Sequence, residues 1–334
     1  MESGGYMVTL KDIAKKAGVS VMTVSRVVNG NQSKVSAKTA KRINKIIDEL
    51  GYVPNYSARS LISKKTNIIA IILRKDSKPD NPYNARMLSG IIPFLQEKGY
   101  YSMVVGLDNF KEVSRHLKSW HAAGAIFLGL FEDDVLSIQD EHDIPLIFTD
   151  SYNNLDTITN VGIDDYKGGC LAAQHFISKG HTKVGLATYA IDHSPISKAR
   201  FQGFTDTLKK HHIEINDEHI YNDHSPEHIV EKALKTDITG LFITADILAL
   251  DVMEILKEKG HLVPDRMSII GFDDLPYGKY SSPRLTTIQQ DIDEKAKVAC
   301  DLLLNNMDQK LPSKNYIIDV KLQIRDSVKD YSTV

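Results

Sequence analysis

The sequence of 334 residues is poor in cysteine and contains no long apolar run. Its two cysteines, Cys170 and Cys300, are too few for a disulfide framework, which suits a reducing compartment. The longest unbroken apolar run that we find, residues 68–73, is far shorter than the roughly 20 residues that a membrane-spanning helix needs. The N-terminal stretch has no basic region followed by an apolar segment, so we expect no signal peptide. These absences predict a cytoplasmic protein with no membrane partner.

Motifs of enzyme and cofactor sites are also missing. No G-x-G-x-x-G follows the first expected strand, and Cys170 has neither an evident histidine partner nor a G-x-S-x-G setting. His224 and His228 have the i, i+4 spacing of metal ligands on a helix, but no cysteine accompanies them. We therefore predict no enzymatic activity, no cofactor and no metal ion.

The composition that is present, 42% hydrophobic and 25% charged, is typical of globular proteins, but the charge is unevenly distributed. Residues 1–65 carry twelve Lys or Arg and four Asp or Glu, a net charge of +8. The remaining residues carry 29 basic and 39 acidic side chains, a net charge of −10. A basic segment on an acidic body favours a segment that binds a polyanion. The alternative is that its lysine-rich helices are simply solvated.

The basic segment has the pattern of a helix-turn-helix. Residues 10–17 place apolar side chains on one helical face, and Gly18 can adopt the left-handed conformation of a tight turn. Ser20 is a good N-cap for a second helix over residues 21–29, and a third helix is expected over residues 36–50. Valines form the inward stripe of the second helix. The side chains left for solvent or a DNA groove are Val21, Met22, Thr23, Ser25 and Arg26.

A short hinge is expected after this module. Pro54 disfavours helix at the preceding residue, and Asn55 can cap a helix over residues 56–62. A helix of this length is marginal in water. We therefore divide the chain into a headpiece at residues 8–54, a hinge at 55–65 and a body at 66–330. On pattern alone, the headpiece could also be a generic helical bundle.

In the body, short apolar runs alternate with helical stretches, and the alternation occurs in two successive halves. Continuous apolar strands between helices indicate parallel sheets that are covered on both faces, so two Rossmann-like α/β lobes are predicted. In such sheets ligands bind beyond the carboxyl ends of the strands. The candidate ligand-binding residues at these ends are Arg74, Asp150, Asp246 and Asp273.

The string VTLKDIAKKAGVSVMTVSRVVNG, followed by VSAKTAKRINKIIDELGYVPNYSARSL, resembles the headpiece and hinge of the lactose-repressor (LacI/GalR) family. The resemblance continues more loosely to about residue 328. It implies a homodimeric transcriptional regulator, usually a repressor, that binds double-stranded operator DNA and a carbohydrate-like effector. It also implies a type I periplasmic-binding-protein fold, with an N-lobe of about residues 66–163 and 290–318 and a C-lobe of about 164–289 and 319–330.

The resemblance assigns roles in DNA binding. Val21 and Met22 take the positions that discriminate operators, and Arg26 takes the position that meets a guanine, whose O6 and N7 a guanidinium can contact together. In the hinge, Leu61 matches a leucine that wedges into the minor groove, and Asn55 joins the DNA-binding set. Phosphate contacts are implied for Thr9, Ser20, Thr23, Ser25 and Asn29.

For the effector cleft, the resemblance implies that Arg200 and Asp273 hold the ligand, because an arginine donates to its oxygens and a carboxylate accepts from its hydroxyls. Asp150 matches a further sugar contact, and Tyr83 matches an aromatic that lines the cleft. The chain departs from the family at residues 245 and 246, where Ala-Asp replaces the usual Asn-Asp. The missing amide argues against ordinary hexose specificity, whereas the charge of Arg74 favours a phosphorylated or acidic effector.

Three functions compete at this point. The first is the effector-controlled regulator. The second is a solute-binding or nucleoside-sensing protein of the same two-lobed fold that has acquired a basic head, against which the headpiece match and the missing signal peptide argue. The third is an enzyme on a doubly wound fold, which the fold alone does not exclude.

Overall fold

The computed structural model describes residues 8–28, 30, 34–52, 66–75, 81–107, 109, 112–129, 135, 138, 144–151, 158–189, 191, 194–309 and 312–332. The chain forms two units, Met1–Thr66 and Asn67–Val334, each with a core of its own. We call them the headpiece unit and the effector unit. The predicted hinge, with Asn55 and Leu61, lies outside the described residues, as does Asn29.

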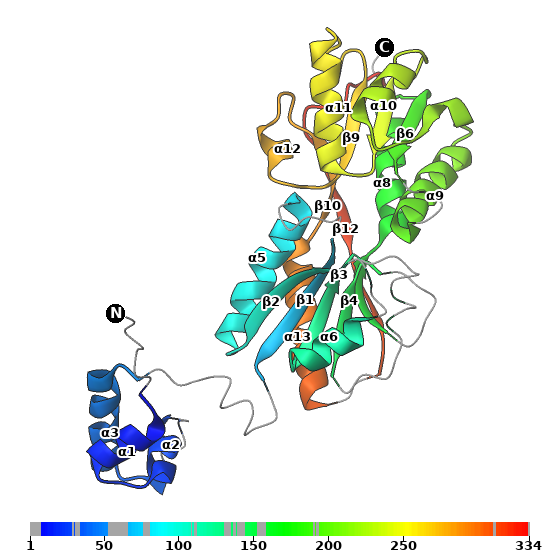
Figure 1. Ribbon diagram of the computed structural model, residues 1–334. Coiled ribbons are helices and arrows are strands. Elements are labelled where there is room, and N and C mark those ends of the chain that lie inside the picture. Colours follow the sequence, from blue (N-terminus) through cyan, green and yellow to red (C-terminus); the bar gives the residue numbers. More distant parts are fainter. Residues whose placement is uncertain are drawn as a thin grey trace. The chain divides into compact units, whose positions relative to one another are not determined.

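Three helices form the headpiece unit: α1 (Leu10–Ala17), α2 (Val21–Val28) and α3 (Ala37–Leu50), shown in blue in Figure 1. The predicted turn is confirmed, since Gly18 has a φ of +62° in the left-handed region. The hydroxyl of Ser20 accepts a hydrogen bond from the amide of Thr23 at 3.2 Å and so caps α2. Each helix contributes buried apolar residues to one shared core, and Ile13, Val24 and Ile43 are fully buried in it. This core is small, and its three helices depend on one another.

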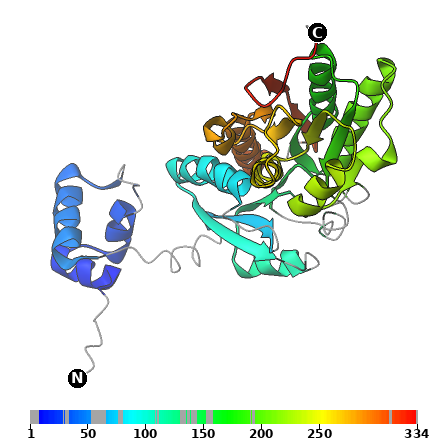
Figure 2. The same ribbon diagram turned by 90° about the horizontal axis from the view of Figure 1, so that it is seen from above.

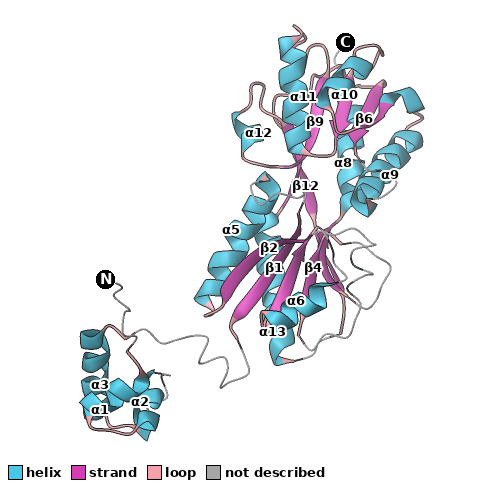
Figure 3. Cartoon of the chain, viewed as in Figure 1, coloured by secondary structure: helices cyan, strands magenta, loops and turns pink. Residues whose placement is uncertain are grey.

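The effector unit has two lobes, each built on a six-stranded sheet (Figure 3). In the N-lobe the strand order is β11-β5-β4-β3-β1-β2, and in the C-lobe it is β12-β10-β9-β8-β6-β7. The N-lobe strands are β1 (Ile68–Arg74), β2 (Tyr101–Leu107), β3 (Gly124–Leu128), β4 (Leu146–Thr149), β5 (Thr159–Ile163) and β11 (Asn315–Ile318). The C-lobe strands are β6 (Val184–Thr188), β7 (Ile220–Asn222), β8 (Gly240–Ile243), β9 (Ser268–Asp273), β10 (Thr286–Gln290) and β12 (Val320–Gln323).

Helices cover these sheets on both faces, as Figure 2 shows from above. In the N-lobe they are α5 (Pro82–Glu97), α6 (Val113–Ser119) and α13 (Ile292–Asp308). In the C-lobe they are α8 (Asp165–Ser178), α9 (Pro195–Lys210), α10 (Pro226–Ala233), α11 (Asp246–Glu258) and the short α12 (Tyr277–Tyr280), with a 3₁₀ turn at Asp217–His219. No helix in the described ranges is long and apolar enough to cross a membrane.

The sequence of β1 does not alternate between apolar and polar residues, because both faces of its sheet are buried. Ile69, Ile71 and Leu73 point into the core beneath α5 and α13, while Ala70 and Ile72 point into the core beneath α6. Because successive side chains of a strand face opposite sides of the sheet and both sides are covered, every position is apolar. The expectation of doubly covered parallel strands is confirmed for the N-lobe sheet, whose five described strand pairs are all parallel.

The C-lobe sheet departs from this expectation at one edge, where β12 pairs antiparallel with β10. The reason is the path of the chain. After β11 ends in the N-lobe, the chain passes through Asp319 directly into β12, so β12 runs away from the boundary between the lobes while β10 runs toward it. The two strands lie side by side at the neck of the effector unit in Figure 1. The chain therefore changes lobe three times: after β5, after β10 and at Asp319.

Helices α8 and α9 approach each other at two glycines. A Cβ added at Gly169 would lie 2.1 Å from the carbonyl oxygen of Arg200, and one added at Gly203 would lie 1.9 Å from that of Tyr166. Both obstacles are backbone atoms, which cannot rotate away. The close approach also brings α9 near Asp165, at the start of α8, where Arg200 pairs with it.

We expect Gly203→Ala to destabilise the effector unit by about 1–3 kcal/mol or more, because the methyl group forces α8 and α9 apart. Urea unfolding measures this change. Gln202→Ala, an exposed neighbour on the same helix, is the control and should stay within about 0.5 kcal/mol of the parent. Equal stability of the two variants would contradict the importance of this contact.

Candidate functional site

The first residue of α2 and its neighbour present apolar side chains to solvent. Val21 is 41% exposed and Met22 65% exposed, so neither is buried in the core of the headpiece unit. Arg26 lies one turn further along, and its guanidinium donates to the sulfur of Met22 at 3.5 Å. This face holds one cation with several donors beside two apolar groups, which suits the acceptor edge of a guanine and the methyl groups of thymines.

Hydroxyl groups lie near the N-termini of α1 and α2. The hydroxyls of Ser20 and Thr23 are 2.9 Å apart, and Ser25 is half-buried on α2. On α1 the hydroxyl of Thr9 donates to the carboxylate of Asp12 at 2.6 Å, and the same carboxylate accepts the Thr9 amide at 2.9 Å. The structure thus gives Thr9 and Ser20 capping roles, which are compatible with an added phosphate contact at a helix N-terminus.

In the effector unit, Arg200 is held in the C-lobe by three groups. Its Nε donates to Asp165 at 2.7 Å, its Nη1 donates to the carbonyl of Thr244 at 2.6 Å, and its guanidinium stacks over the ring of Phe272, 3.5 Å from the ring centre. The side chain is buried. Such a guanidinium is rigid, which favours an oriented contact with a ligand over a loose one.

Asp273 ends β9 in an unusual backbone conformation. It has a φ of +115°, and the next residue, Asp274, has a φ of +54°. Two successive non-glycine residues in this region are strained, and such strain is common at functional sites. Burial raises the pKa of Asp273 to about 6, against the opposite effects of the Arg200 charge and of the hydrogen bond from Gln290.

Asp246 lies beneath this turn and is fully buried. Its carboxyl group accepts the amide of Leu275 at 2.7 Å and the hydroxyl of Thr287 at 2.6 Å. Burial raises the pKa of Asp246 well above its usual value, and the neighbouring charge of Asp273 adds to the effect. Leu275 in turn packs in the core of the N-lobe. The structure therefore places Asp246 where it supports the turn, rather than in contact with solvent.

Tyr83 and Asp150 are hydrogen-bonded to each other in the N-lobe. Both also contact Lys295, which the sequence patterns do not single out. The hydroxyl of Tyr83 donates to Asp150 at 2.5 Å, and the ammonium of Lys295 on α13 donates to Asp150 at 2.7 Å. The same ammonium donates to the Gln290 oxygen at 2.7 Å, and the Gln290 amide donates to Asp273 at 2.6 Å. Three of the predicted residues, Tyr83, Asp150 and Asp273, are thus joined by hydrogen bonds.

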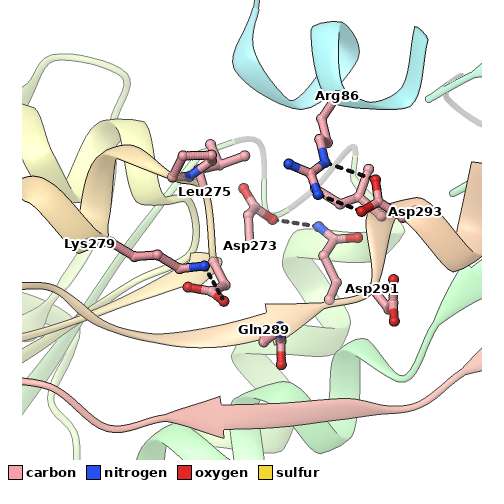
Figure 4. Close-up of a pocket in the computed structure, with 11 residues that line it drawn as sticks. Arg86, Asp273, Leu275, Lys279, Gln289, Asp291 and Asp293 are labelled. Carbon is pink, nitrogen blue, oxygen red and sulfur yellow. Dashed lines mark hydrogen bonds and ion pairs between the residues drawn. The ribbon is translucent and has the colours of Figure 1, made fainter. Parts of the chain in front are cut away.

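A cavity of about 240 Å³ lies at the boundary between the lobes (Figure 4). Asp273 and Lys279 border it from the C-lobe, and Arg86 and Asp293, which form an ion pair, border it from the N-lobe. Charged groups of both signs therefore surround the cavity. A ligand that offers both donors and acceptors fits these walls better than an apolar one.

The sequence patterns also miss Tyr189, which does not border this cavity but lies within reach of the charges of Arg200 and Asp273. Tyr189 directly follows β6, and its ring stacks on that of His224 with centroids 4.7 Å apart. Burial raises the pKa of Tyr189, and the charges of Arg200 and Asp273 both act on its hydroxyl. Its position directly after an apolar run is the sequence signal that could have identified it as a candidate ligand-binding residue. Arg74, by contrast, is half-buried at the end of β1 and pairs in register with Leu107 of β2.

Comparison with known proteins bears on both units. A family model described as bacterial regulatory proteins, lacI family, matches residues 9–55, and one described as a periplasmic binding protein-like domain matches residues 173–328. An HTH-type transcriptional repressor PurR of Aliivibrio salmonicida is 31% identical over 316 residues, which is 91% of this chain and 93% of the relative. A probable HTH-type transcriptional repressor ExuR of Bacillus subtilis is 30% identical over 98% of this chain and 100% of its own.

Among solved structures, the Lac repressor dimer bound to operator and the anti-inducer ONPF superimposes with a TM-score of 0.85. It is 25% identical in sequence, and the match covers 97% of this chain and 100% of that chain. The similarity therefore extends over the headpiece unit and both lobes.

We expect Asp246→Ala to destabilise the effector unit by several kcal/mol, because it leaves two buried donors, the Leu275 amide and the Thr287 hydroxyl, without acceptors at about 1–3 kcal/mol each. Urea unfolding is again the measurement. Asp251→Ala removes an exposed carboxylate from the same helix and should change stability little. A matching small change for Asp246→Ala would mean that the carboxyl group does not support the turn.

Proposed function

Because the chain belongs to the LacI family of bacterial transcriptional regulators, we propose that it represses transcription from an operator and that a small polar molecule bound between its lobes controls this repression. The headpiece unit binds double-stranded DNA, and the effector unit binds the small molecule. The family resemblance of the sequence and the solvent-facing side chains of α2 support the same conclusion. We place this activity in the cytoplasm, where operator DNA is found, and we assign no catalytic step to it.

The observation that carries the DNA-binding function is the exposed face of α2. The exposed Val21 and Met22 at the start of this capped helix can contact the methyl groups of thymines. The neighbouring Arg26 offers the bidentate donor that reads guanine in the major groove. The basic charge of the segment supplies the sequence-independent part of the affinity.

The polar groups of the boundary between the lobes favour a hydroxyl-rich effector. Asp273 presents a carboxylate that accepts hydroxyl donors, and Arg200 presents a rigid guanidinium that donates to ligand oxygens. The ring of Tyr189 adds an apolar surface of the kind that stacks on a sugar or a base. A carbohydrate-like effector uses all three groups.

We propose that the regulator is a homodimer and that the C-lobe contributes to its interface. Tyr280, at the end of α12, is 86% exposed, and the next residue, Ser281, lines a second cavity. The walls of this cavity are partly apolar, with Met253 and Leu262, and partly charged, with Glu254 and Lys257. An exposed aromatic beside a cavity with apolar and charged walls suits a two-fold contact, in which each copy offers the same surface. A dimer also presents two headpieces to the two halves of a palindromic operator.

We expect Arg26→Ala to weaken operator binding by about 1–3 kcal/mol and to reduce the preference for one G·C pair, because the bidentate contact is lost. Fluorescence anisotropy with an operator selected in vitro, and with single-base variants of it, measures both effects. Lys11→Ala, an exposed charge on α1, should instead weaken binding to all sequences alike. A variant of Arg26 that retained its base preference would exclude a base-reading role.

A thermal-shift screen of sugars, sugar acids, sugar phosphates and nucleosides should identify the effector, since a ligand at 100 times its Kd adds about 2.7 kcal/mol of stability. We expect Asp273→Asn to keep the operator affinity measured without effector and to lose most of the effector response. The isosteric amide leaves the headpiece untouched but offers hydroxyl groups a weaker acceptor. Asp251→Asn is the control. An unchanged response in Asp273→Asn would remove this residue from the binding site.

A further inference from the structure

Lys295 is a fully buried lysine at the boundary between the lobes. Its side chain is 0% exposed, and it projects from the first turns of α13, which packs in the N-lobe core. A buried ammonium group is costly unless all its donors are satisfied and a counter-charge lies beside it. Asp150 supplies the counter-charge, and the three acceptors of the ammonium are Asp150, Gln290 and Tyr83, the last at 3.1 Å.

This arrangement fixes the orientation of the Gln290 amide. An ammonium can only donate, so the Gln290 oxygen must face Lys295. The Gln290 nitrogen then faces Asp273, whose ionised carboxylate can only accept. The hydrogen bonds therefore run in one direction from Lys295 in the N-lobe, through Gln290 at the end of β10, to Asp273 in the C-lobe.

Several other charged or titratable groups face Asp273. Arg86, Lys279, Asp291 and Asp293 line the same cavity (Figure 4). Arg200 approaches it from α9, and Asp246 approaches it from α11. Tyr189 lies at the end of β6, and Asp150 lies at the end of β4. Asp274, next to it in the chain, is itself paired with Arg325 and Lys279. Only the route through Lys295 and Gln290 reaches Asp273 from the N-lobe by hydrogen bonds that the structure describes.

We propose that Lys295 is a positioning residue of the effector cleft, which orients Gln290 and, through it, the carboxylate of Asp273. Asp150 and Tyr83 then hold Lys295 in place and do not bind the effector. The proposal rests on the proposed function, because it assumes that Asp273 receives the effector. It changes the expected roles of two residues. Each oxygen of Asp150 already accepts a hydrogen bond, one from Lys295 and one from Tyr83, so the position of this carboxylate is set by groups of the protein itself.

The ionisation of Asp273 supplies a readout that needs neither effector nor DNA. Its pKa of about 6 lies above the usual value of about 3.9, so between these pH values the native state holds more protons than the unfolded state. The free energy of unfolding therefore falls as the pH rises through this range and levels off above it. Lys295 and the Gln290 hydrogen bond both lower the pKa of Asp273, so losing them extends the fall to higher pH.

The experiment is urea unfolding of the full chain at several pH values between 5 and 8, followed by the fluorescence of Trp120, the one tryptophan, which lies in the effector unit. In Lys295→Met we expect an additional fall in stability between pH 6 and 8. Adding Asp273→Asn should remove the part of this fall that belongs to Asp273. The neutral pair Asp150→Asn/Lys295→Met, which leaves no uncompensated charge, guards against failure of the single variant to fold. It should show a smaller shift in the same direction, because the charge of Asp150, which raises the pKa of Asp273, is lost together with that of Lys295.

Lys295 and Gln290 each have a residue of the same type nearby in the chain, which serves as a matched control. Lys297→Met removes an exposed lysine from the same helix and should leave the pH profile unchanged. Gln290→Leu should reproduce the shift, whereas Gln289→Leu, whose side-chain oxygen accepts from Gln323 instead, should not. If Asp273→Asn alters the pH profile equally with and without Lys295, the lysine does not act on Asp273 and the proposal is wrong. The effector response of Asp273→Asn, measured separately, tests the proposed function itself.

Discussion

The buried ammonium of Lys295 is the interaction on which the arrangement at the boundary between the lobes depends. It binds a carboxylate and a phenol of the N-lobe on one side and an amide at the end of a C-lobe strand on the other. An ion in this position cannot lose one partner without a large cost, because water does not reach it to replace the bond. Any change in the angle between the lobes must therefore keep these bonds or exchange them for others.

Around this interaction, each lobe holds its own part of the cleft rigidly. In the C-lobe, the glycine contacts between α8 and α9 and the pairing with Asp165 fix Arg200, while Asp246 supports the strained turn after β9. In the N-lobe, Tyr83 and Asp150 are fixed by each other. A ligand that binds between two rigid walls shifts their relative position only by its different affinity for the two arrangements, which is the physical requirement for an effector.

The headpiece unit differs from the lobes in having a small core and exposed apolar side chains. Its core is small, and two of its larger apolar side chains, Val21 and Met22, remain at the surface, where DNA can cover them. Stability is limited in such a small unit. The Ser20 hydroxyl that caps α2 adds about 0.5–2 kcal/mol, and Gly18 adopts the left-handed conformation of the turn without strain. Residues that a larger domain would bury are thereby kept available for base contacts.

The sequence by itself determined the helices of the headpiece unit and the alternation of strands and helices in the lobes, because hydrophobic periodicity, caps and the run IIAIIL are local signals. It also indicated Arg200 and Asp273, through the family resemblance and the ends of strands. Only the tertiary structure decided that β12 is antiparallel, since that depends on where the chain changes lobe. It also decided that Asp246 is buried beneath a turn and that Lys295, which no sequence pattern singles out, is buried. Burial and pairing of a charge depend on residues that are far away in the chain, in this case 145 positions between Lys295 and Asp150, and no local pattern contains that information.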